Sequence, residues 1–312
     1  MTKGRQFPNS VLRFYGNVDF ALDTLGTREI TLINVSLLND PFDPYFFFET
    51  DFEEDYKAFI DYVSARYPRE LGWFLSEMTL EWWQQAVPKL RAYFKQLRQR
   101  LYVFSTSAVY ENEHPKNNLY MWGHYANGHR GVAIEFNTVN IGKQYIDEHN
   151  KKHGQGLQAK DAWQPIDYEQ RLPLLTREML FDFAKAEHNR ETRPTLLDGF
   201  YSIISQTKSL DWKSENEWRI LWSRDDTARK TIRVPISETA IESVYIGMSA
   251  SSQAESDVRF EVRRNYPAAR LFKAQGAETT WCVRVKFCDY TLRLYGGLTD
   301  TLYVTRNFGY DK

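Results

Sequence analysis

The stretch Tyr120-Met-Trp-Gly-His-Tyr-Ala-Asn-Gly-His-Arg-Gly-Val-Ala-Ile-Glu-Phe136 contains the change of pattern that decides how this chain folds. Its first half mixes aromatic rings with histidines, and the Asn127-Gly128 pair favours a turn. Its second half, Gly131 to Phe136, is short and apolar and predicts a buried strand. A polar, aromatic segment that turns directly into a core strand places several chemically active side chains at the edge of a sheet.

Separate strand and helix patterns continue on both sides of this stretch. Strands are predicted at Val11–Tyr15, Glu29–Leu37, Leu101–Ser107, Trp218–Trp222, Thr231–Val234, Ser243–Gly247 and Trp281–Phe287. Helices are predicted at Asp19–Leu25, within residues 51–100 (including Leu90–Arg100), and at Arg177–Glu187, Leu196–Gln206 and Ser252–Arg264. Asn17 or Asp19 is expected to cap the first helix, and a capping box of Ser252 and Glu255 the last. The polar residues 138–160 predict a loop with some helix.

The fold class that follows is α+β, with a mixed or antiparallel central sheet and flanking helices. No composition shift marks a linker, so we expect a single domain over residues 1–312 with a mainly helical insertion at about 51–100.

Composition excludes several classes of protein. Forty basic and 41 acidic residues leave a net charge of −1, which argues against nucleic-acid binding through a strongly basic face. Aromatic residues make up 15% of the chain, which excludes a disordered protein. Two cysteines, Cys282 and Cys288, indicate neither a disulfide framework nor a zinc cluster. With no signal peptide and no long apolar run, we expect a cytoplasmic protein that does not enter membranes.

Three motifs carry a family resemblance. They are the Met121-Trp-Gly-His-Tyr-Ala-Asn-Gly-His129 block, the later Trp212-Lys-Ser-Glu-Asn-Glu-Trp-Arg219 block, and Asn39-Asp-Pro-Phe42. Together with Asp167–Pro173 and Val244–Gly247, they resemble the bacterial domain of unknown function 2971 over roughly residues 12–275. This resemblance implies no established activity.

A second resemblance is chemically more informative. Arg13, then Phe104-Ser-Thr-Ser107, then Glu215-Asn-Glu217 follow the order of motifs in the arginine–serine–glutamate class of ADP-ribosyltransferases. The resemblance implies an enzyme of that fold that uses NAD+ as substrate and either transfers ADP-ribose, for example to a protein acceptor, or hydrolyses NAD+. Cleavage of the nicotinamide–ribose bond passes through an oxocarbenium-like state, which a carboxylate stabilises.

The resemblance also implies roles for individual residues. Glu217 would stabilise the developing cation, and Glu215, two residues earlier on the same strand face, would orient or deprotonate an acceptor. Arg13 would hold a phosphate or ribose, and Ser105 would bind the ribose and support the glutamate. Further candidates for binding NAD+ are Ser107, Trp122, Tyr125 and His129.

Other interpretations stay open. His124 could transfer a proton or orient the substrate, whereas His124 and His129 as the centre of a metal-dependent hydrolase or nuclease would need nearby carboxylates. We expect no metal. The tryptophans near these motifs could stack on a nicotinamide or adenine ring or simply fill the core, and Arg130 and Arg219 could bridge carboxylates or face a phosphate. The main alternative to an enzyme is a non-catalytic module that binds a nucleotide-like molecule or a protein, in a setting such as stress or phage defence.

Overall fold

The computed structural model describes residues 5–40, 43–48, 56–110, 114–153, 158–190, 195–224, 229–276 and 283–288. The helices are α1 (Val18–Thr27), α2 (Tyr56–Arg66), α3 (Leu71–Glu77), α4 (Leu80–Arg100), α5 (Leu119–Tyr125), α6 (Thr138–His153), α7 (Arg177–Asn189), α8 (Thr195–Ser205) and α9 (Ser252–Asn265). The strands are β1 (Ser10–Tyr15), β2 (Glu29–Asn34), β3 (Phe47–Phe48), β4 (Leu101–Val109), β5 (Val132–Asn137), β6 (Trp163–Pro165), β7 (Asp167–Glu169), β8 (Leu174–Leu175), β9 (Thr207–Ser209), β10 (Glu217–Ser223), β11 (Thr231–Pro235), β12 (Ile241–Ile246), β13 (Arg270–Gly276) and β14 (Val283–Phe287). The short 3-10 helices are η1 (Val35–Leu37), η2 (Pro115–Asn117), η3 (Ala159–Ala162) and η4 (Leu210–Glu215).

The main sheet has 10 strands, in the order β11-β2-β4-β1-β5-β12-β13-β14, with β10 added beside β4 and β6 beside β10. All its pairings are antiparallel except that of β12 with β13. Two small two-stranded sheets, β3-β8 and β7-β9, lie outside it. The prediction of an α+β fold with a mixed, mostly antiparallel sheet is confirmed.

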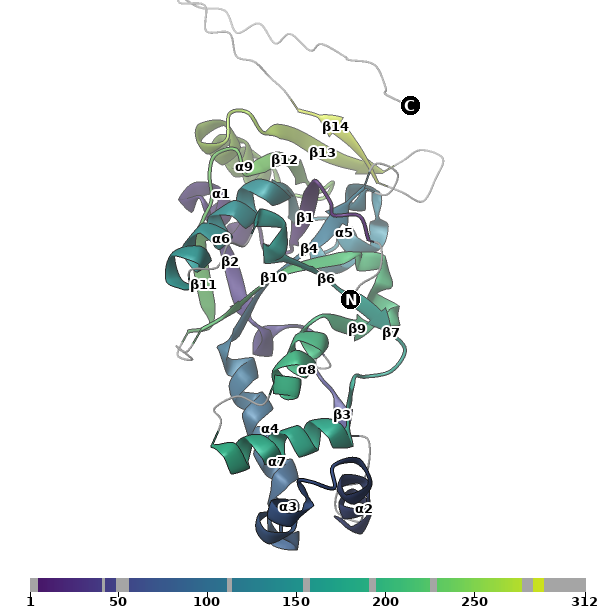
Figure 1. The fold of residues 1–312 in the computed structure, drawn as a ribbon. Helices are drawn as coiled ribbons and strands as arrows, with labels where there is room; N and C mark the ends of the chain where they lie inside the picture. The colour runs from purple at the N-terminus through teal and green to yellow at the C-terminus, as the bar shows by residue number, and fades with distance from the viewer. Residues whose placement is uncertain are drawn as a thin grey trace, which may run out of the picture.

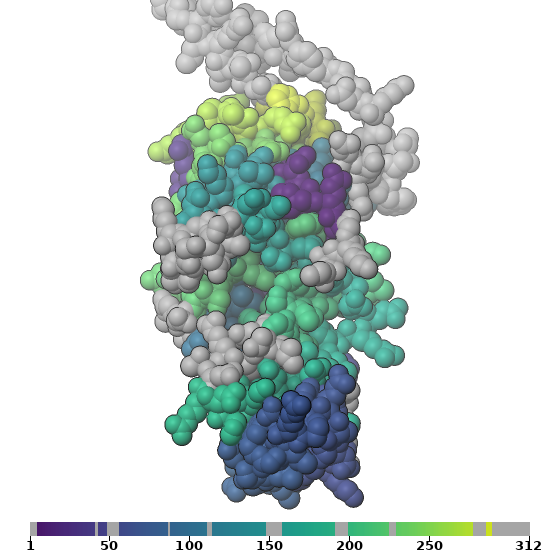
Figure 2. All heavy atoms as spheres, viewed as in Figure 1, coloured from purple at the N-terminus to yellow at the C-terminus, as the bar shows by residue number. Residues whose placement is uncertain are grey.

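Four apolar clusters are found among the described residues, and the two largest join the sheet and the helices. The larger one lies between one face of the main sheet and helices α1, α6 and α9. The second is mainly aromatic and joins α2, α3 and α4 to α7 and α8, at the end of the molecule away from β12–β14 (Figure 1). The side chains of α2 and α3 form the tip of that end in the space-filling view (Figure 2). Among the described helices, none is both long and apolar enough to cross a bilayer.

The first strand–helix–strand unit follows from local chemistry. The Asn17 side chain accepts a hydrogen bond from the Asp19 backbone N–H and so caps α1, as predicted. The helix ends at Arg28, whose left-handed backbone (φ 58°) turns the chain into β2. The predicted strand Glu29–Leu37 is too long: β2 stops at Asn34, because the Asn34 carboxamide accepts from the Ser36 N–H at 3.0 Å and opens η1.

Two further predictions differ from the structure. Residues 138–160 were predicted as a loop with some helix, but residues 138–153 form one continuous helix, α6, because Ile141 and Ile146 bury one side of an otherwise polar segment against the sheet. Helix α9 is capped by Ser251, whose hydroxyl accepts from the Ala254 N–H at 3.1 Å, and not by the predicted Ser252 box. Pro41, Phe42 and Cys282, which were part of the sequence analysis, lie outside the described residues.

A gap in the main sheet determines where a ligand could enter. One edge of β4 pairs with β10 over Leu101–Ser107. The other edge is shared by two strands: β2 pairs with Tyr102 and Val103, and β1 pairs with residues 107–109. Between them, residues 104–106 pair with neither β1 nor β2, so the two strands diverge there and leave an opening over the middle of β4.

Candidate functional site

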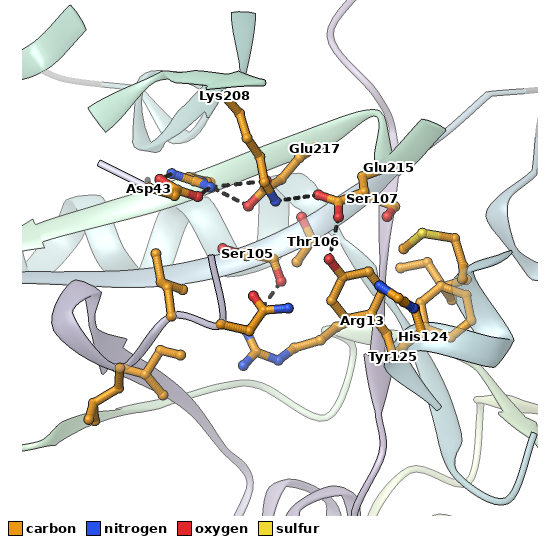
Figure 3. Close-up of a pocket in the computed structure, with 18 residues that line it drawn as sticks. Arg13, Asp43, Ser105, Thr106, Ser107, His124, Tyr125, Lys208, Glu215 and Glu217 are labelled. Atoms are coloured by element: carbon orange, nitrogen blue, oxygen red, sulfur yellow. Dashed lines mark hydrogen bonds and ion pairs between the residues drawn. The ribbon is translucent and has the colours of Figure 1, made fainter. Parts of the chain in front are cut away.

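A cavity of about 360 Å³ occupies this opening in the sheet (Figure 3). Its floor is Ser105, Thr106 and Ser107 of β4. The strands β1, β2, β9 and β10, the 3-10 helices η1 and η4, helix α5 and the segment that follows η1 contribute the rest of its lining. The volume falls in the range typical of small-molecule sites.

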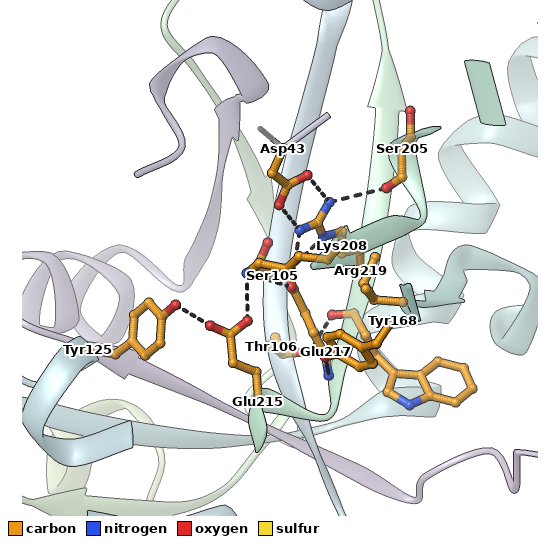
Figure 4. A network of polar contacts seen from close by, with 12 residues as sticks. Asp43, Ser105, Thr106, Tyr125, Tyr168, Ser205, Lys208, Glu215, Glu217 and Arg219 are labelled. Atoms are coloured by element: carbon orange, nitrogen blue, oxygen red, sulfur yellow. Dashed lines mark hydrogen bonds and ion pairs between the residues drawn. The ribbon is translucent and has the colours of Figure 1, made fainter. Parts of the chain in front are cut away.

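Glu217 lies at the centre of a row of charged side chains on one side of the cavity. Its backbone pairs with Ser107, and the residue is 4% exposed. The carboxylate accepts hydrogen bonds from Arg219 Nε at 2.7 Å and Arg219 Nη2 at 3.1 Å, and from Lys208 Nζ at 3.3 Å (Figure 4). The Glu217 backbone N–H donates to the Tyr168 hydroxyl at 2.7 Å. This carboxylate is therefore fixed in position before any ligand arrives.

The same network extends in both directions from Glu217. Arg219, which is 1% exposed, forms a bidentate ion pair with Asp43 and donates to the Ser205 carbonyl at 3.2 Å. On the other side, Lys208 Nζ donates to Glu215 at 2.6 Å, and the Tyr125 hydroxyl donates to the second oxygen of Glu215. We call Asp43, Arg219, Glu217, Lys208, Glu215 and Tyr125 the charged wall. Opposite charges alternate from Asp43 to Glu215, which allows five charged side chains to be buried together, and the partly buried Tyr125 ends the row.

The pKa values of Glu217 and Glu215 are shifted in opposite directions. Burial raises the pKa of Glu217, but Arg219 and Lys208 outweigh burial and hold that pKa at about 2. Burial and the neighbouring Glu217 charge raise the pKa of Glu215 above its ordinary value, although Lys208 opposes them. Glu217 is thus a permanent anion at neutral pH, whereas Glu215 is the carboxylate better suited to proton exchange. A pair of titratable groups whose pKa values diverge in this way is a common sign of an acid–base site.

Arg13 supplies a cation with unused hydrogen-bond donors. Its guanidinium lies 4.6 Å from the centre of the Phe104 ring and donates to the Ser105 carbonyl at 3.2 Å. Among the residues that the structure describes, no carboxylate forms an ion pair with it, and burial lowers its pKa. A guanidinium has five N–H donors, so most of those of Arg13 remain for a ligand in the cavity.

Ser105 also lines the cavity, and its hydroxyl lacks a complete set of hydrogen-bond partners among the described residues. Its hydroxyl oxygen is buried and has no hydrogen-bond partner of standard geometry in the described part of the chain, although it lies near Glu217 and helps to lower the pKa of that carboxyl. The neighbouring Thr106 hydroxyl, by contrast, donates to the Trp218 carbonyl at 2.9 Å. An unsatisfied buried hydroxyl is costly unless a ligand or water completes it.

The structure brings most of the sequence-predicted site residues together. Those that line the cavity are Arg13, Ser105, Ser107, His124, Tyr125, Glu215 and Glu217. Glu215 does so for a different reason from the one predicted. It is the last residue of η4 and precedes the strand, and the left-handed Asn216 (φ 47°) reverses the chain so that both carboxylates reach Lys208.

Two predicted residues lie elsewhere. Trp122 is fully buried, packs edge-on against Phe14, and donates from its indole N–H to the Lys116 carbonyl at 2.7 Å. His129 stacks on Trp122 with ring centres 6.2 Å apart, and neither residue lines the cavity. Asn127, Gly128 and His129 all have positive φ values, so a tight turn separates His129 from helix α5, which carries His124.

Sequence reasoning missed several residues of the site. Lys208 and Asp43 sit beside quoted motifs but were given no role, and the cavity residues Ile33, Leu37 and Leu38 looked like ordinary apolar positions. Arg219 was considered, and it bridges the carboxylates Asp43 and Glu217. In the described ranges, no group of three or more His, Cys, Asp or Glu side chains is placed to hold a metal ion.

Comparison with known proteins shows that part of this chain matches a described protein family. Residues 121–220, which include α5, η4 and the start of β10, match the family model described as Protein of unknown function (DUF2971). The resemblance to this family is confirmed over residues 121–220, a shorter stretch than the predicted range of about 12–275. The DUF2971 region supplies Tyr125, Lys208, Glu215, Glu217 and Arg219, all of them in the charged wall. No curated protein and no solved structure matches the chain, and none of the comparisons shows a resemblance to ADP-ribosyltransferases.

Proposed function

We propose that this protein is an NAD+-using enzyme of the ADP-ribosyltransferase type, which transfers ADP-ribose or hydrolyses NAD+. The observation that carries the proposal is the placement of Arg13, Ser105 and Glu217. They lie on β1, β4 and β10, which are adjacent in the sheet, and all three line one cavity. The order of these three residues along the sequence does not by itself require that their side chains meet in one cavity.

Arg13 accounts for binding. Its unused donors match the oxygens of a phosphate, and bidentate contacts of this kind are strong when partly shielded from water. The Ser105 hydroxyl, on the residue whose backbone carbonyl accepts from Arg13, can complete its hydrogen bonding with a ribose hydroxyl. Both features favour a nucleotide over an uncharged ligand.

Glu217 accounts for bond cleavage. As the bond between nicotinamide and ribose C1′ breaks, its electron pair leaves with nicotinamide and positive charge develops on the ribose. A carboxylate that is ionised and already held by Arg219 and Lys208 stabilises that charge without reorganising. The acceptor, water or a protein side chain, then adds to C1′ and loses its proton to Glu215, whose raised pKa suits it to accept one.

Release of nicotinamide from NAD+ tests this proposal directly. Glu217→Gln keeps the size of the side chain and removes the charge, so it should lower the rate by roughly 100-fold or more. Glu238→Gln is the matched control, because Glu238 is exposed in the connection between β11 and β12, outside the cavity. Equal nicotinamide release by the wild type and Glu217→Gln would refute the catalytic role, and no release by the wild type would refute the proposal.

One observation favours a second candidate, a nucleotide-binding module without turnover. Both glutamates are already engaged by cations, Glu217 by Arg219 and Lys208, and Glu215 by Lys208. If these pairs persist in the bound state, the carboxylates shape the cavity but do not react. Calorimetry with ADP-ribose separates the two candidates: binding that depends on Arg13, together with no nicotinamide release, supports the module. Arg171→Gln, on an exposed arginine outside the cavity, is the control for Arg13→Gln.

A further inference from the structure

The side of the cavity formed by β2 and η1 is apolar, in contrast to the charged wall. It consists of Ile33, Leu37 and Leu38, which we call the apolar wall. Leu37 is 50% exposed, and Ile33 and Leu38 are partly exposed. Exposed leucine is common on protein surfaces, but here the exposed surface lines a cavity that also contains a cation with unused donors. Such a wall is suited to one flat, weakly polar part of a ligand.

The strand β4 fixes the order of these features. Ile33 pairs with Val103, the Arg13 guanidinium bonds the Ser105 carbonyl, and Glu217 pairs with Ser107. Alternate residues along a strand share a face and are separated by about 6.6 Å, so the apolar wall and Glu217 attach about 13 Å apart along β4. The phosphate-binding cation lies between them. The cavity thus presents an apolar surface, a cation and a reactive carboxylate in that order.

A dinucleotide has the same order of chemical groups. The ring next to the bond that breaks must lie at the Glu217 end, where Leu12, Phe14 and Met121 complete the lining. The pyrophosphate lies in the middle, and the second heteroaromatic ring lies at the far end. We propose that the apolar wall binds the adenine ring of NAD+. This inference rests on the proposed function, and it assigns the orientation of the substrate and the residues that select its base.

Binding of substrate fragments to Leu37→Ala tests the inference. AMP, ribose 5-phosphate and nicotinamide mononucleotide are titrated by calorimetry into the wild type and the variant. Loss of apolar contact should weaken AMP roughly tenfold, while ribose 5-phosphate and nicotinamide mononucleotide stay within about twofold. Leu37→Met, which keeps an apolar side chain of similar size, should restore most of the AMP affinity.

The control is Leu80→Ala, because Leu80 is 52% exposed at the start of α4 and lies outside the cavity. Equal thermal midpoints for the variants exclude unfolding as the cause of any loss. Three results would overturn the inference: unchanged AMP affinity in Leu37→Ala, a loss confined to nicotinamide mononucleotide, or no AMP binding by the wild type. Loss of AMP affinity in a protein that releases no nicotinamide would support this assignment while refuting the proposed reaction.

Discussion

Replacing Arg219 with methionine should expose how the charged wall is stabilised. Arg219 is 1% exposed, and its guanidinium donates to Glu217 at 2.7 and 3.1 Å, to Asp43 in a bidentate pair, and to the Ser205 carbonyl at 3.2 Å. Methionine fills much of the same volume without any donor. The change therefore leaves the Asp43 and Glu217 carboxylates buried with reduced compensation, while packing is largely kept.

The expected loss follows from the burial of those carboxylates. Removing one partner of a buried ion pair costs about 3–5 kcal/mol, out of a total stability of about 5–15 kcal/mol for a typical protein. Lys208 still contacts Glu217, so Asp43 should account for the larger share. If unpaired charge is the cause, adding Asp43→Asn to Arg219→Met should recover part of the loss, because the amide removes one buried charge.

Urea unfolding followed by circular dichroism at pH 7 measures these free energies, with a check that the slope m is unchanged. Arg171→Met is the control, since Arg171 is exposed and its loss should change stability by less than about 0.5 kcal/mol. A loss below about 1 kcal/mol for Arg219→Met would refute the reasoning. So would a double variant less stable than Arg219→Met alone.

Three other changes probe the sheet and the helices. Burial raises the pKa of Glu135, but the His114 ring, 3.7 Å from the carboxylate, and hydrogen bonds from Tyr245 and Ser10 outweigh burial and bring that pKa from 4.5 to about 2. The ionised Glu135 carboxylate therefore stabilises the fold fully above pH 4.5, and this stabilisation is lost as the pH falls towards 2. In urea titrations, Glu135→Gln should lower the free energy of unfolding by about 3 kcal/mol at pH 7 and by less than half of that at pH 3. A loss of stability independent of pH would contradict this prediction. Gly247→Ala would place a Cβ 2.2 Å from the His129 carbonyl oxygen and should lower stability by about 1–3 kcal/mol or more, unless the strand shifts freely. Gly199→Ala, in α8 with open space around its Cβ position, should instead raise stability by about 0.5–1 kcal/mol, and a lower thermal midpoint would count against that.

The sequence predicted those elements whose signal is local. The cap at Asn17, the apolar runs of β1 and β5, and the charged periodic helix α9 depend on neighbours within a few residues, and all three form near their predicted positions. The full extent of helix α6 was not predicted, because among its described side chains Ile141 and Ile146 are buried in the main core and Tyr145 packs against it, too few to give a clear helical pattern. Its burial is decided by the sheet against which it packs.

The candidate site likewise divides into residues that local sequence signals identified and residues that only tertiary contacts placed. The order of Arg13, Ser105 and Glu217 along the chain was enough to nominate them, because each belongs to a recognisable strand or strand edge. Trp122 and His129 were nominated by nearness in sequence to His124 and Tyr125, but neither lines the cavity: Trp122 packs edge-on against Phe14 in the core, and His129, beyond a left-handed turn, stacks on Trp122. Sequence nearness does not determine which way a side chain points after a turn.

What the sequence by itself determined is the α+β class, most strands and helices, and the residue types that could act on a nucleotide. Tertiary structure alone decided that β1 and β2 diverge over β4 and open a cavity there. It also decided that Lys208 joins two glutamates from different elements and that Leu37 faces the same space as Arg13. The physical reason is that these relations depend on strand register and on contacts across more than 90 residues of chain, such as Arg13 with Ser105, which local preferences do not encode.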